Sequence, residues 1–217
     1  MELYSYFRSS ASYRVRIALN FKNMEYSYKP VHLLNNGGEQ RTDNYTDINP
    51  IEQVPAIRDG STTISQSMAI FEYLDQINPE PLLFSSDPAE AAQIRQICEL
   101  VNSGIQPLCN LYVLQTLKRD FGLNEDQKNQ WAVHFHKRGL TALEKMVAKS
   151  KSEYSVGDRV TAADMFVVAH IFSALRYDVN LDEYPSLKEI NNKCLELDFF
   201  KKAHPYAQPD TPDEFKN

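Results

Sequence analysis

The spacing of hydrophobic positions changes near residue 80. Before that point, short apolar or aromatic runs alternate with stretches of helical spacing. Strands are predicted for residues 3–7, 26–31, 54–58 and 62–65, and helices for residues 9–21 and for a stretch that Ser67 caps. The order is β-α-β followed by β-β-α, which predicts a small α/β domain with a mixed sheet.

The chemistry of the connections predicts how these strands pair. The helix over residues 9–21 has the length of a crossover, so the strand after it should run parallel to the first strand. Asp59-Gly60 separates the last two strands and is a strong hairpin signal. The sheet should therefore contain one parallel pair and one antiparallel hairpin.

The pattern after residue 87 is helical throughout. Helices are predicted for residues 89–117, with a break at Gly104 and Pro107, and for residues 124–149, 161–175, 185–197 and 198–203. Two prolines within residues 78–84 end the last helix of the first domain. We predict an α/β domain over residues 1–80, a linker over 81–87 and an all-helical domain over 88–217. The tail at 208–213 either covers the body as an extended strap or forms a disordered end.

Composition and charge exclude several classes of protein. The chain has 217 residues, with 23 Lys and Arg against 29 Asp and Glu, a formal net charge of −6. This acidic balance argues against broad nucleic-acid binding. No apolar run reaches the roughly 18 residues of a membrane helix, and no secretory signal is visible at the N-terminus. Three scattered cysteines do not form a disulfide framework, so a cytoplasmic protein is predicted.

Several conspicuous residues have ordinary structural explanations. Asp164 follows Thr161 by three positions at a helix start, and this pattern favours a capping role over a catalytic one. His134 and His136 lie two residues apart and face different sides of a helix, and no metal site is predicted. A proline opens the third strand at Pro55, and general statistics favour a trans peptide there.

The most informative cluster lies where the first strand meets the first helix. Ser9 and Ser10 stand at a predicted helix N-terminus, whose free N–H groups and dipole favour an anion, and Arg8 and Arg14 flank the same turn. The simpler explanation is that one of the serines is only an N-cap. Gln66-Ser67 opens a second helix N-terminus that suits a carboxylate.

The motifs of the chain resemble the zeta class of cytosolic glutathione transferases. Residues 9–19 read Ser-Ser-Ala-Ser-Tyr-Arg-Val-Arg-Ile-Ala-Leu, close to the class pattern Ser-Ser-Cys-x-x-Arg-Val-Arg-Ile-Ala-Leu. The likeness continues through residues 49–55, 66–74, 104–108, 156–158, 204–205 and 208–212, and so covers nearly the whole chain. The resemblance implies an α/β thioredoxin-like N-terminal domain with a cis-proline before its third strand, and an all-α C-terminal domain.

The resemblance also implies roles for individual residues. Ser9 matches the residue that activates the glutathione thiol, and Ser10 helps to hold the thiolate. The other implied glutathione contacts are Gln40, Gln53, the backbone of Val54, Gln66, Ser67 and, from the helical domain, Gln106. Arg8, Arg14 and Arg176 are the candidates for the acidic groups of the substrate, and Arg14 for stabilising an enolate.

The activity implied by the resemblance is isomerisation of maleylacetoacetate to fumarylacetoacetate, a step of tyrosine and phenylalanine breakdown. A glutathione thiolate adds to the cis double bond, the resulting single bond rotates, and elimination leaves the trans isomer. The cofactor is glutathione, the substrate is a small dianion, and a homodimer is implied. Maleylpyruvate isomerisation, transfer to small α-halo acids and a non-catalytic binding module remain as alternatives.

Two positions depart from the class pattern. Ala11 stands where the class has a cysteine, so no protein thiol takes part there. Because glutathione itself supplies the nucleophile, we expect activity to survive and substrate orientation to change. Cys109 stands where the class usually has glutamine, which puts contacts near it in doubt.

Overall fold

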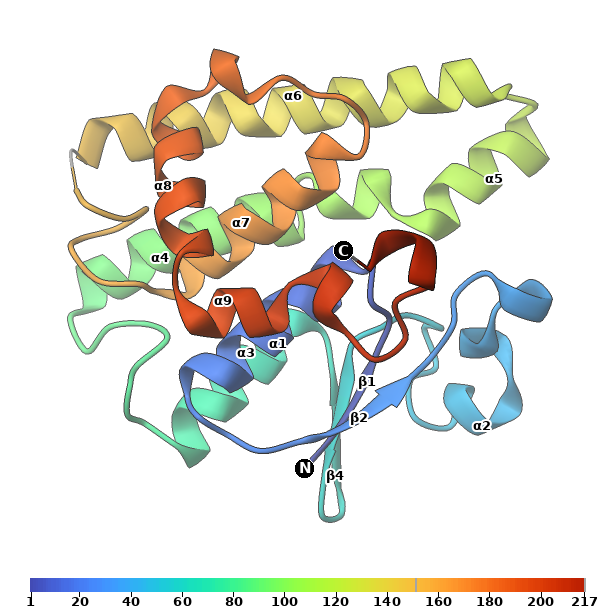
Figure 1. Ribbon diagram of the computed structural model, residues 1–217, viewed down its shortest axis with the longest axis horizontal. Coiled ribbons are helices and arrows are strands. Elements are labelled where there is room, and N and C mark those ends of the chain that lie inside the picture. Colours follow the sequence, from blue (N-terminus) through green and yellow to red (C-terminus); the bar gives the residue numbers. More distant parts are fainter. Residues whose placement is uncertain (151, 217) are drawn as a thin grey trace. The chain divides into compact units, whose positions relative to one another are not determined.

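The computed structural model describes residues 1–150 and 152–216, and it divides into two compact units (Figure 1). One unit consists of Met1–Leu83 together with the chain from Leu195 onward, and the other is Phe84–Cys194. The predicted helical domain over residues 88–217 therefore differs from the structure at its C-terminal end. The reason is that the last helix packs on the first helix of the α/β unit, where the rings of Phe21 and Phe199 lie 5.2 Å apart.

The first unit contains a four-stranded mixed sheet in the order β2-β1-β3-β4. The strands are β1 (Glu2–Ser5), β2 (Ser27–Pro30), β3 (Ala56–Asp59) and β4 (Thr62–Ser65). The pairs β1–β2 and β3–β4 are parallel and antiparallel, respectively, which confirms both predicted connections. β1 also pairs antiparallel with β3.

Two strands are shorter than the sequence predicts. β1 ends at Ser5 instead of residue 7, because the amide of Phe7 donates to the carboxylate of Asp210 and not to a neighbouring strand. β3 begins at Ala56 instead of residue 54, because Pro55 has no N–H to donate to the ladder.

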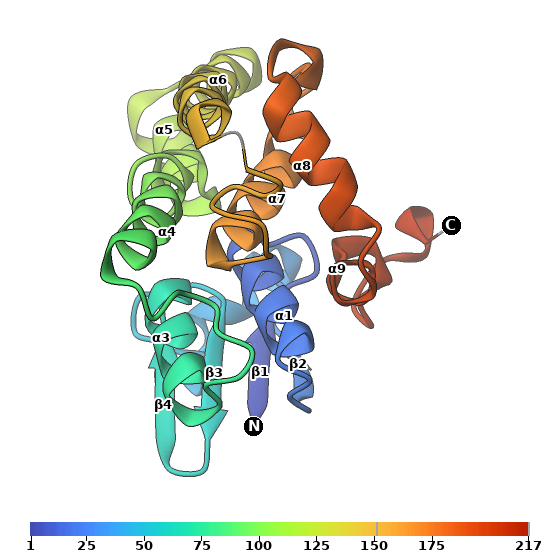
Figure 2. The same ribbon diagram turned by 90° about the vertical axis from the view of Figure 1, so that its left-hand side faces the viewer.

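Helices α1 (Ser10–Phe21), α3 (Ser67–Ile77) and α9 (Asp198–Ala203) lie side by side in the first unit, with α1 in the middle (Figure 2). This position buries α1 from Ser12 to Leu19, including both of its arginines. The short helix α2 (Asp43–Thr46) lies in the long connection between β2 and β3.

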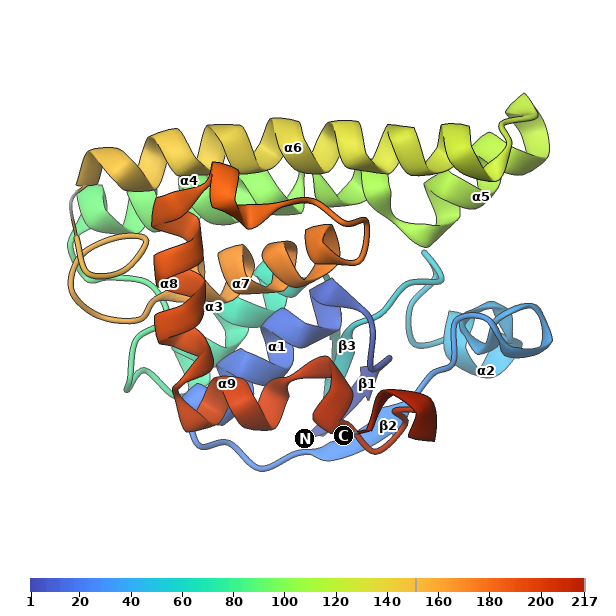
Figure 3. The same cartoon turned by 45° about the horizontal axis from the view of Figure 1, so that its top comes forward.

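All regular secondary structure in the described residues of the second unit is helical (Figure 3). Its helices are α4 (Pro88–Asn102), α5 (Leu111–Phe121), α6 (Glu125–Ser150), α7 (Ala162–Leu175) and α8 (Pro185–Leu195), which ends at the unit boundary. α7 packs against α4 and α6 and is apolar nearly all round, as a central helix requires. No helix in the described residues is long and apolar enough to cross a membrane.

Local signals explain the breaks and caps of this unit. The predicted break separates α4 from α5, with Pro107 in a 3₁₀ turn between them. A Cβ atom on Gly104 would lie 2.7 Å from the carbonyl oxygen of Leu100. The amide of Thr161 donates to Asp164 Oδ2 at 2.8 Å, so the capping interpretation of Asp164 is confirmed.

One local prediction in the first unit is wrong, and one is confirmed. Ser67 is the first residue of α3 and not its cap, because Gln66 occupies the N-cap position with a positive φ of 71°. The Val54–Pro55 peptide is cis, against general statistics and in agreement with the family resemblance. A second cis peptide, Glu80–Pro81, was not anticipated.

Candidate active site

Strand register brings three predicted segments to one end of the sheet. Ala56 of β3 pairs with Tyr4 of β1 and with Ser65 of β4. The turn that follows β1, the cis peptide that precedes β3 and the start of α3 after β4 must therefore lie at the same edge. These are the segments that carry Ser9, Val54 and Gln66-Ser67.

Ser9 is the N-cap of α1. Its backbone is extended (φ −69°, ψ 117°), and its Oγ accepts a hydrogen bond of 3.1 Å from the amide of Ser12. The cap occupies one acceptor lone pair of the hydroxyl, so its proton is available to a ligand at the helix N-terminus. Ser9 is therefore a cap and a potential donor to an anion at the same time. Ser10, the first residue of the helix, is half-buried like Ser9.

The turn between β1 and Ser9 is held by a buried arginine. Arg16 Nη2 donates to the carbonyl oxygen of Phe7 at 3.1 Å, and Nη1 donates to Ser5 Oγ at 3.0 Å. Burial lowers the pKa of Arg16 because it removes water from the charged group. A further hydrogen bond, from Nε to the carbonyl oxygen of Ala203 at 3.0 Å, offsets part of this loss of hydration. The side chain of Arg16 is thus a structural clamp on the turn that carries Ser9.

The backbone at Val54 is also anchored from several sides. The carbonyl oxygen of Gln53 accepts 2.6 Å hydrogen bonds from Tyr45 Oη and from Asn49 Nδ2. Val54 packs in a cluster with Phe7, next to the Ser9 turn. The peptide groups around Val54 are therefore pre-positioned for a backbone ligand. The sequence named Gln53 and Val54 but not the two side chains that hold them.

The Gln66-Ser67 segment has an unusual backbone and a buried partner. A positive φ at a non-glycine residue is a costly conformation, and such residues concentrate at functional sites. Ser67 is buried, and its Oγ accepts a 3.2 Å hydrogen bond from Arg14 Nη1. This contact ties the second turn of α1 to the first turn of α3.

The placement of Arg14 corrects its predicted role. Its side chain has a relative exposure of 0% and points to Ser67 within the helix pair. A fully buried guanidinium offers no surface to the acidic groups of a substrate. The geometry supports a role in positioning Ser67 instead, because α1 is enclosed between its neighbours.

Gln40 lies beneath the glycine-rich loop. Its Nε2 donates to the carbonyl oxygen of Leu33 at 3.4 Å, and its buried Oε1 has no hydrogen-bond partner within residues 1–150 and 152–216. A Cβ atom on Gly38 would come within 2.5 Å of this amide, so the loop requires glycine there (φ +104°). The side-chain carbonyl of Gln40 is thus a buried acceptor that a ligand donor would satisfy.

The remaining predicted residues are Arg8 in the first unit and Gln106 and Arg176 in the second. The guanidinium carbon of Arg8 lies 5.7 Å from the ring centre of Phe215, near the C-terminus. Gln106 is half-buried at the start of a 3₁₀ turn, and Arg176 is exposed at the C-cap of α7; both belong to the helical unit. In that unit, burial raises the pKa of the Cys109 thiol to about 12, which keeps it protonated and unreactive.

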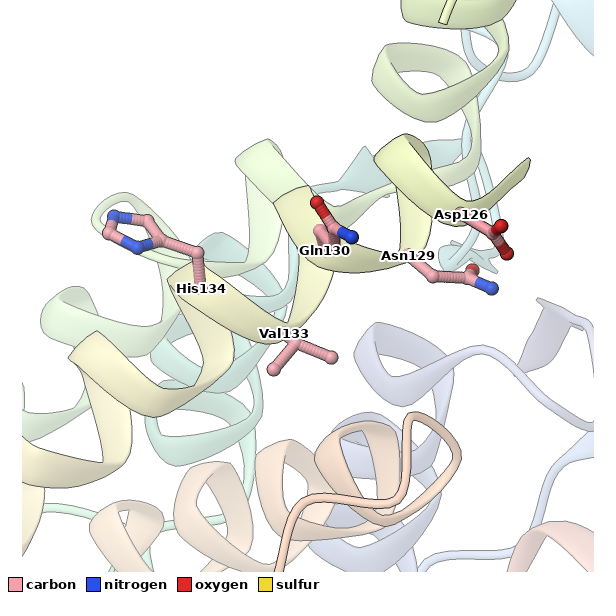
Figure 4. A pocket seen from close by; sticks show the side chains of 5 residues that line it. All are labelled: Asp126, Asn129, Gln130, Val133 and His134. Atoms are coloured by element: carbon pink, nitrogen blue, oxygen red, sulfur yellow. The ribbon is translucent and has the colours of Figure 1, made fainter. Parts of the chain in front are cut away.

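One face of α6 in the helical unit carries an open surface hollow that the sequence did not predict. It has a volume of about 490 Å³ and is lined by one face of α6 (Figure 4). The lining residues are Asp126, Asn129, Gln130, Val133 and His134. They combine one carboxylate, one imidazole and two amides around a single apolar side chain.

Comparison with known proteins identifies a family for this chain. Residues 1–76 match the glutathione S-transferase N-terminal domain, and residues 113–202 match the C-terminal domain. The chain is 43% identical over 214 residues to mouse maleylacetoacetate isomerase, with 99% of this chain and 96% of that protein covered.

Two solved structures show the same fold. A bacterial maleyl pyruvate isomerase, described as a zeta-class glutathione S-transferase, superposes with a TM-score of 0.94 at 36% identity and covers 98% of this chain and 100% of its own. The maleylacetoacetate isomerase from Anaeromyxobacter dehalogenans, solved with glutathione in its active site, has a TM-score of 0.86 at 39% identity, with 97% of each chain covered. The predicted thioredoxin-like and all-α fold is therefore confirmed, and the chain belongs to the zeta class of the glutathione S-transferase family.

Proposed function

We propose that this chain catalyses the glutathione-dependent cis–trans isomerisation of maleylacetoacetate to fumarylacetoacetate. The observation that carries the proposal is the Ser9 hydroxyl at the N-cap of α1, at the same sheet edge as the backbone of Val54 and the start of α3. Relatives with the same family membership and full-length similarity are named maleylacetoacetate isomerases, the mouse protein among them.

The residues present fit glutathione. Two helix N-termini, at Ser9-Ser10 and at Gln66-Ser67, suit its two kinds of anion, a thiolate and a carboxylate. The backbone at Val54 suits its extended peptide portion. The buried Oε1 of Gln40 is an acceptor that a ligand N–H would satisfy. Gln53 completes the predicted set in the first unit.

Bound glutathione supplies a thiolate that adds to the conjugated cis double bond and is eliminated after rotation. The task of Ser9 is to donate its hydroxyl proton to the sulfur, while the N–H groups and dipole of α1, with Ser10, favour the same charge. A thiol has an ordinary pKa of about 8.5, and lowering it by about one and a half units raises the thiolate fraction at pH 7 roughly fifteenfold.

The substrate is a dianion and needs cationic partners. Arg8 and Arg176 are the arginines proposed for its carboxylates, and Gln106 is proposed to approach from the helical unit. Arg14 does not contact the substrate in this proposal but positions Ser67 through their hydrogen bond. A cytoplasmic homodimer that serves tyrosine and phenylalanine breakdown is the biological setting proposed, on the strength of the family resemblance.

A second candidate is maleylpyruvate isomerisation. The bacterial maleyl pyruvate isomerase superposes on this chain with a TM-score of 0.94, and its reaction would use the same thiolate. Ala11, where the class pattern has cysteine, leaves a methyl group in the first turn of α1 and changes the surface near the reacting sulfur. Small α-halo acids are the further substrates to compare.

The experiment is isomerisation of maleylacetone with and without glutathione, in the native chain and in Ser9→Ala. We expect turnover that requires glutathione, and a loss of about 10²–10³-fold in kcat in Ser9→Ala with little change in glutathione affinity. Ser9→Thr keeps both the cap and the hydroxyl and should retain most of the activity. Ser61→Ala, in the exposed β3–β4 hairpin, is the matched serine control.

Ser9→Ala also removes a helix cap, which costs about 1 kcal/mol of stability, so Tm is measured for each variant. An equal loss of activity and affinity in Ser9→Ala would contradict the assigned role of the hydroxyl. Failure of the native chain to bind glutathione would favour a non-catalytic binding module. Binding without turnover of maleylacetone, but with turnover of maleylpyruvate, would favour the second candidate.

A further inference from the structure

The C-terminal segment Pro205–Phe215, here called the C-terminal strap, returns across the α/β unit after α9. Figure 3 shows it in dark red next to β2. Its central residue, Asp210, lies about two hundred positions from the Ser9 turn in sequence but touches that turn in space.

Asp210 holds the main chain of the turn directly. Its Oδ2 accepts a 3.0 Å hydrogen bond from the amide of Phe7, two residues before Ser9. Its Oδ1 accepts a 2.7 Å hydrogen bond from Tyr28 Oη of β2, and burial raises the pKa of that tyrosine, which keeps its proton in place. Hydrogen bonds to an ionised acceptor are shorter and stronger than neutral ones.

Both main-chain polar groups of Phe7 are therefore hydrogen-bonded to buried or anchored side chains. Asp210 takes its N–H, while Arg16 Nη2 donates to its carbonyl oxygen at 3.1 Å. Arg16 Nε also donates to the carbonyl oxygen of Ala203, at the end of α9. The C-terminal part of the chain thus contacts the turn through a carboxylate and shares its arginine clamp.

The C-terminal strap is itself well anchored. Phe215 stacks on Tyr206 with ring centres 5.3 Å apart and an interplanar angle of 8°. The ring of Phe215 also lies 6.1 Å from that of Phe7. Buried Thr211 donates through Oγ1 to the carbonyl oxygen of Pro205 at 2.9 Å, which closes the loop that presents Asp210.

We propose that Asp210 is a positioning residue for Ser9, through which the C-terminal strap sets the strength of the hydrogen bond from the Ser9 hydroxyl to a bound thiolate. The inference rests on the proposed function of Ser9. A hydrogen bond weakens steeply as its angle departs from linear, and small displacements of a reacting group cost large factors in rate. Releasing the amide of Phe7 loosens the turn from which Ser9 is presented.

The test compares Asp210→Ala and Asp210→Asn with the native full-length chain. Asp210→Ala removes both acceptors. Asp210→Asn retains a carbonyl oxygen for the amide of Phe7 and turns an NH₂ group toward the oxygen of Tyr28, so it is the rescue variant. Asp213→Ala is the matched control, since Asp213 is an exposed carboxylate of the same strap that pairs with Lys216.

Two readouts do not depend on turnover. The first is hydrogen–deuterium exchange of the peptide that spans residues 6–13, measured without glutathione; we expect it to be about tenfold faster in Asp210→Ala. The second is the pKa of the thiol of bound glutathione, read from the ultraviolet absorbance of its thiolate; we expect this pKa to be about one unit higher in Asp210→Ala. In turnover assays of the same variant, kcat should be about tenfold lower and KM for glutathione nearly unchanged. Asp210→Asn and Asp213→Ala should stay near the native values.

A lowered Tm in Asp210→Ala with native exchange at residues 6–13 and a native thiol pKa would overturn the proposal and leave Asp210 a purely structural residue. If Asp210→Ala does not fold, Tyr28→Phe releases one carboxylate oxygen and should speed the same exchange several-fold; native exchange there would equally overturn it. If the native chain binds no glutathione, the proposed function fails, while the exchange measurement still decides whether Asp210 holds the turn.

Discussion

A buried histidine in the helical unit makes the stability of this protein depend on pH. His136 of α6 has a relative exposure of 1%, and its ring lies 5.1 Å from that of His170 and 5.2 Å from that of Tyr177. Neither of its nitrogens has a hydrogen-bond partner in the described part of the chain. Burial, assisted by the charge of Arg176, lowers the pKa of His136 from its ordinary 6.5 to about 4.

The sign and size of the effect follow from proton linkage. Between these two pKa values the unfolded chain binds a proton at His136 and the folded chain does not, so acid favours unfolding. The stability is fully present above pH 6.5 and is lost as the pH falls toward 4. A gap of about 2.5 pKa units corresponds to about 3.4 kcal/mol in full, of which about 2 kcal/mol is lost between pH 7 and pH 5.

The assay is denaturant unfolding, followed by circular dichroism, at several pH values between 7 and 5. The native chain is compared with His136→Phe, which keeps an aromatic ring at the site and removes the titration. As the pH falls from 7 to 5, the free energy of unfolding of the variant should rise by about 2 kcal/mol relative to that of the native chain. His134→Phe, two residues away on the exposed side of α6, is the matched control and should track the native chain. Parallel pH profiles for the native chain and His136→Phe would refute the reasoning.

Three further predictions concern packing, capping and ligand binding. Gly139→Ala places a Cβ atom 2.2 Å from Cδ1 of Ile105, so we expect about 1–3 kcal/mol of destabilisation by thermal unfolding, and Ile105→Ala should relieve part of it. Asp164→Ala removes the acceptor for two buried amides and should cost about 3 kcal/mol, while a chain that loses less than 1 kcal/mol would contradict the capping assignment. Gln66→Ala combined with Ser67→Ala should weaken glutathione binding in calorimetry far more than it lowers kcat, and an unchanged Kd would exclude this segment as the carboxylate site.

The sequence determined those features whose causes are local. Apolar runs and the Asp59-Gly60 turn predicted the parallel pair and the hairpin, because side-chain alternation and turn chemistry act over a few residues. Gly104 and Pro107 predicted the break between α4 and α5, and the spacing of Thr161 and Asp164 predicted a cap. The motif around Ser9 identified the family and the position of a helix start.

The tertiary structure decided how those elements enclose one another. The sequence predicts Arg14 as a cation beside a site, yet Arg14 is buried, like Arg16, because α1 lies between α3 and α9. That enclosure involves contacts between segments that are distant in sequence, and no periodicity within α1 reveals it. The residue at the α3 N-cap likewise has a positive φ that no local preference of glutamine favours.

The hydrogen bond between Asp210 and Phe7 joins residues that lie at opposite ends of the sequence. The tail of the chain was predicted as either a covering strap or a disordered end, and sequence patterns could not choose, since the tail has few apolar residues and no helical spacing. The tail packs as a strap because the carboxylate of Asp210 accepts hydrogen bonds from two groups of the α/β unit. These are the amide of Phe7, which has no strand partner beyond the end of β1, and the hydroxyl of Tyr28 in β2. Local chemistry thus determined the elements and the identity of the candidate site. Only the folded chain decided which charges are buried and which distant residues hold Ser9, because burial and long-range hydrogen bonds exist only once the elements have packed.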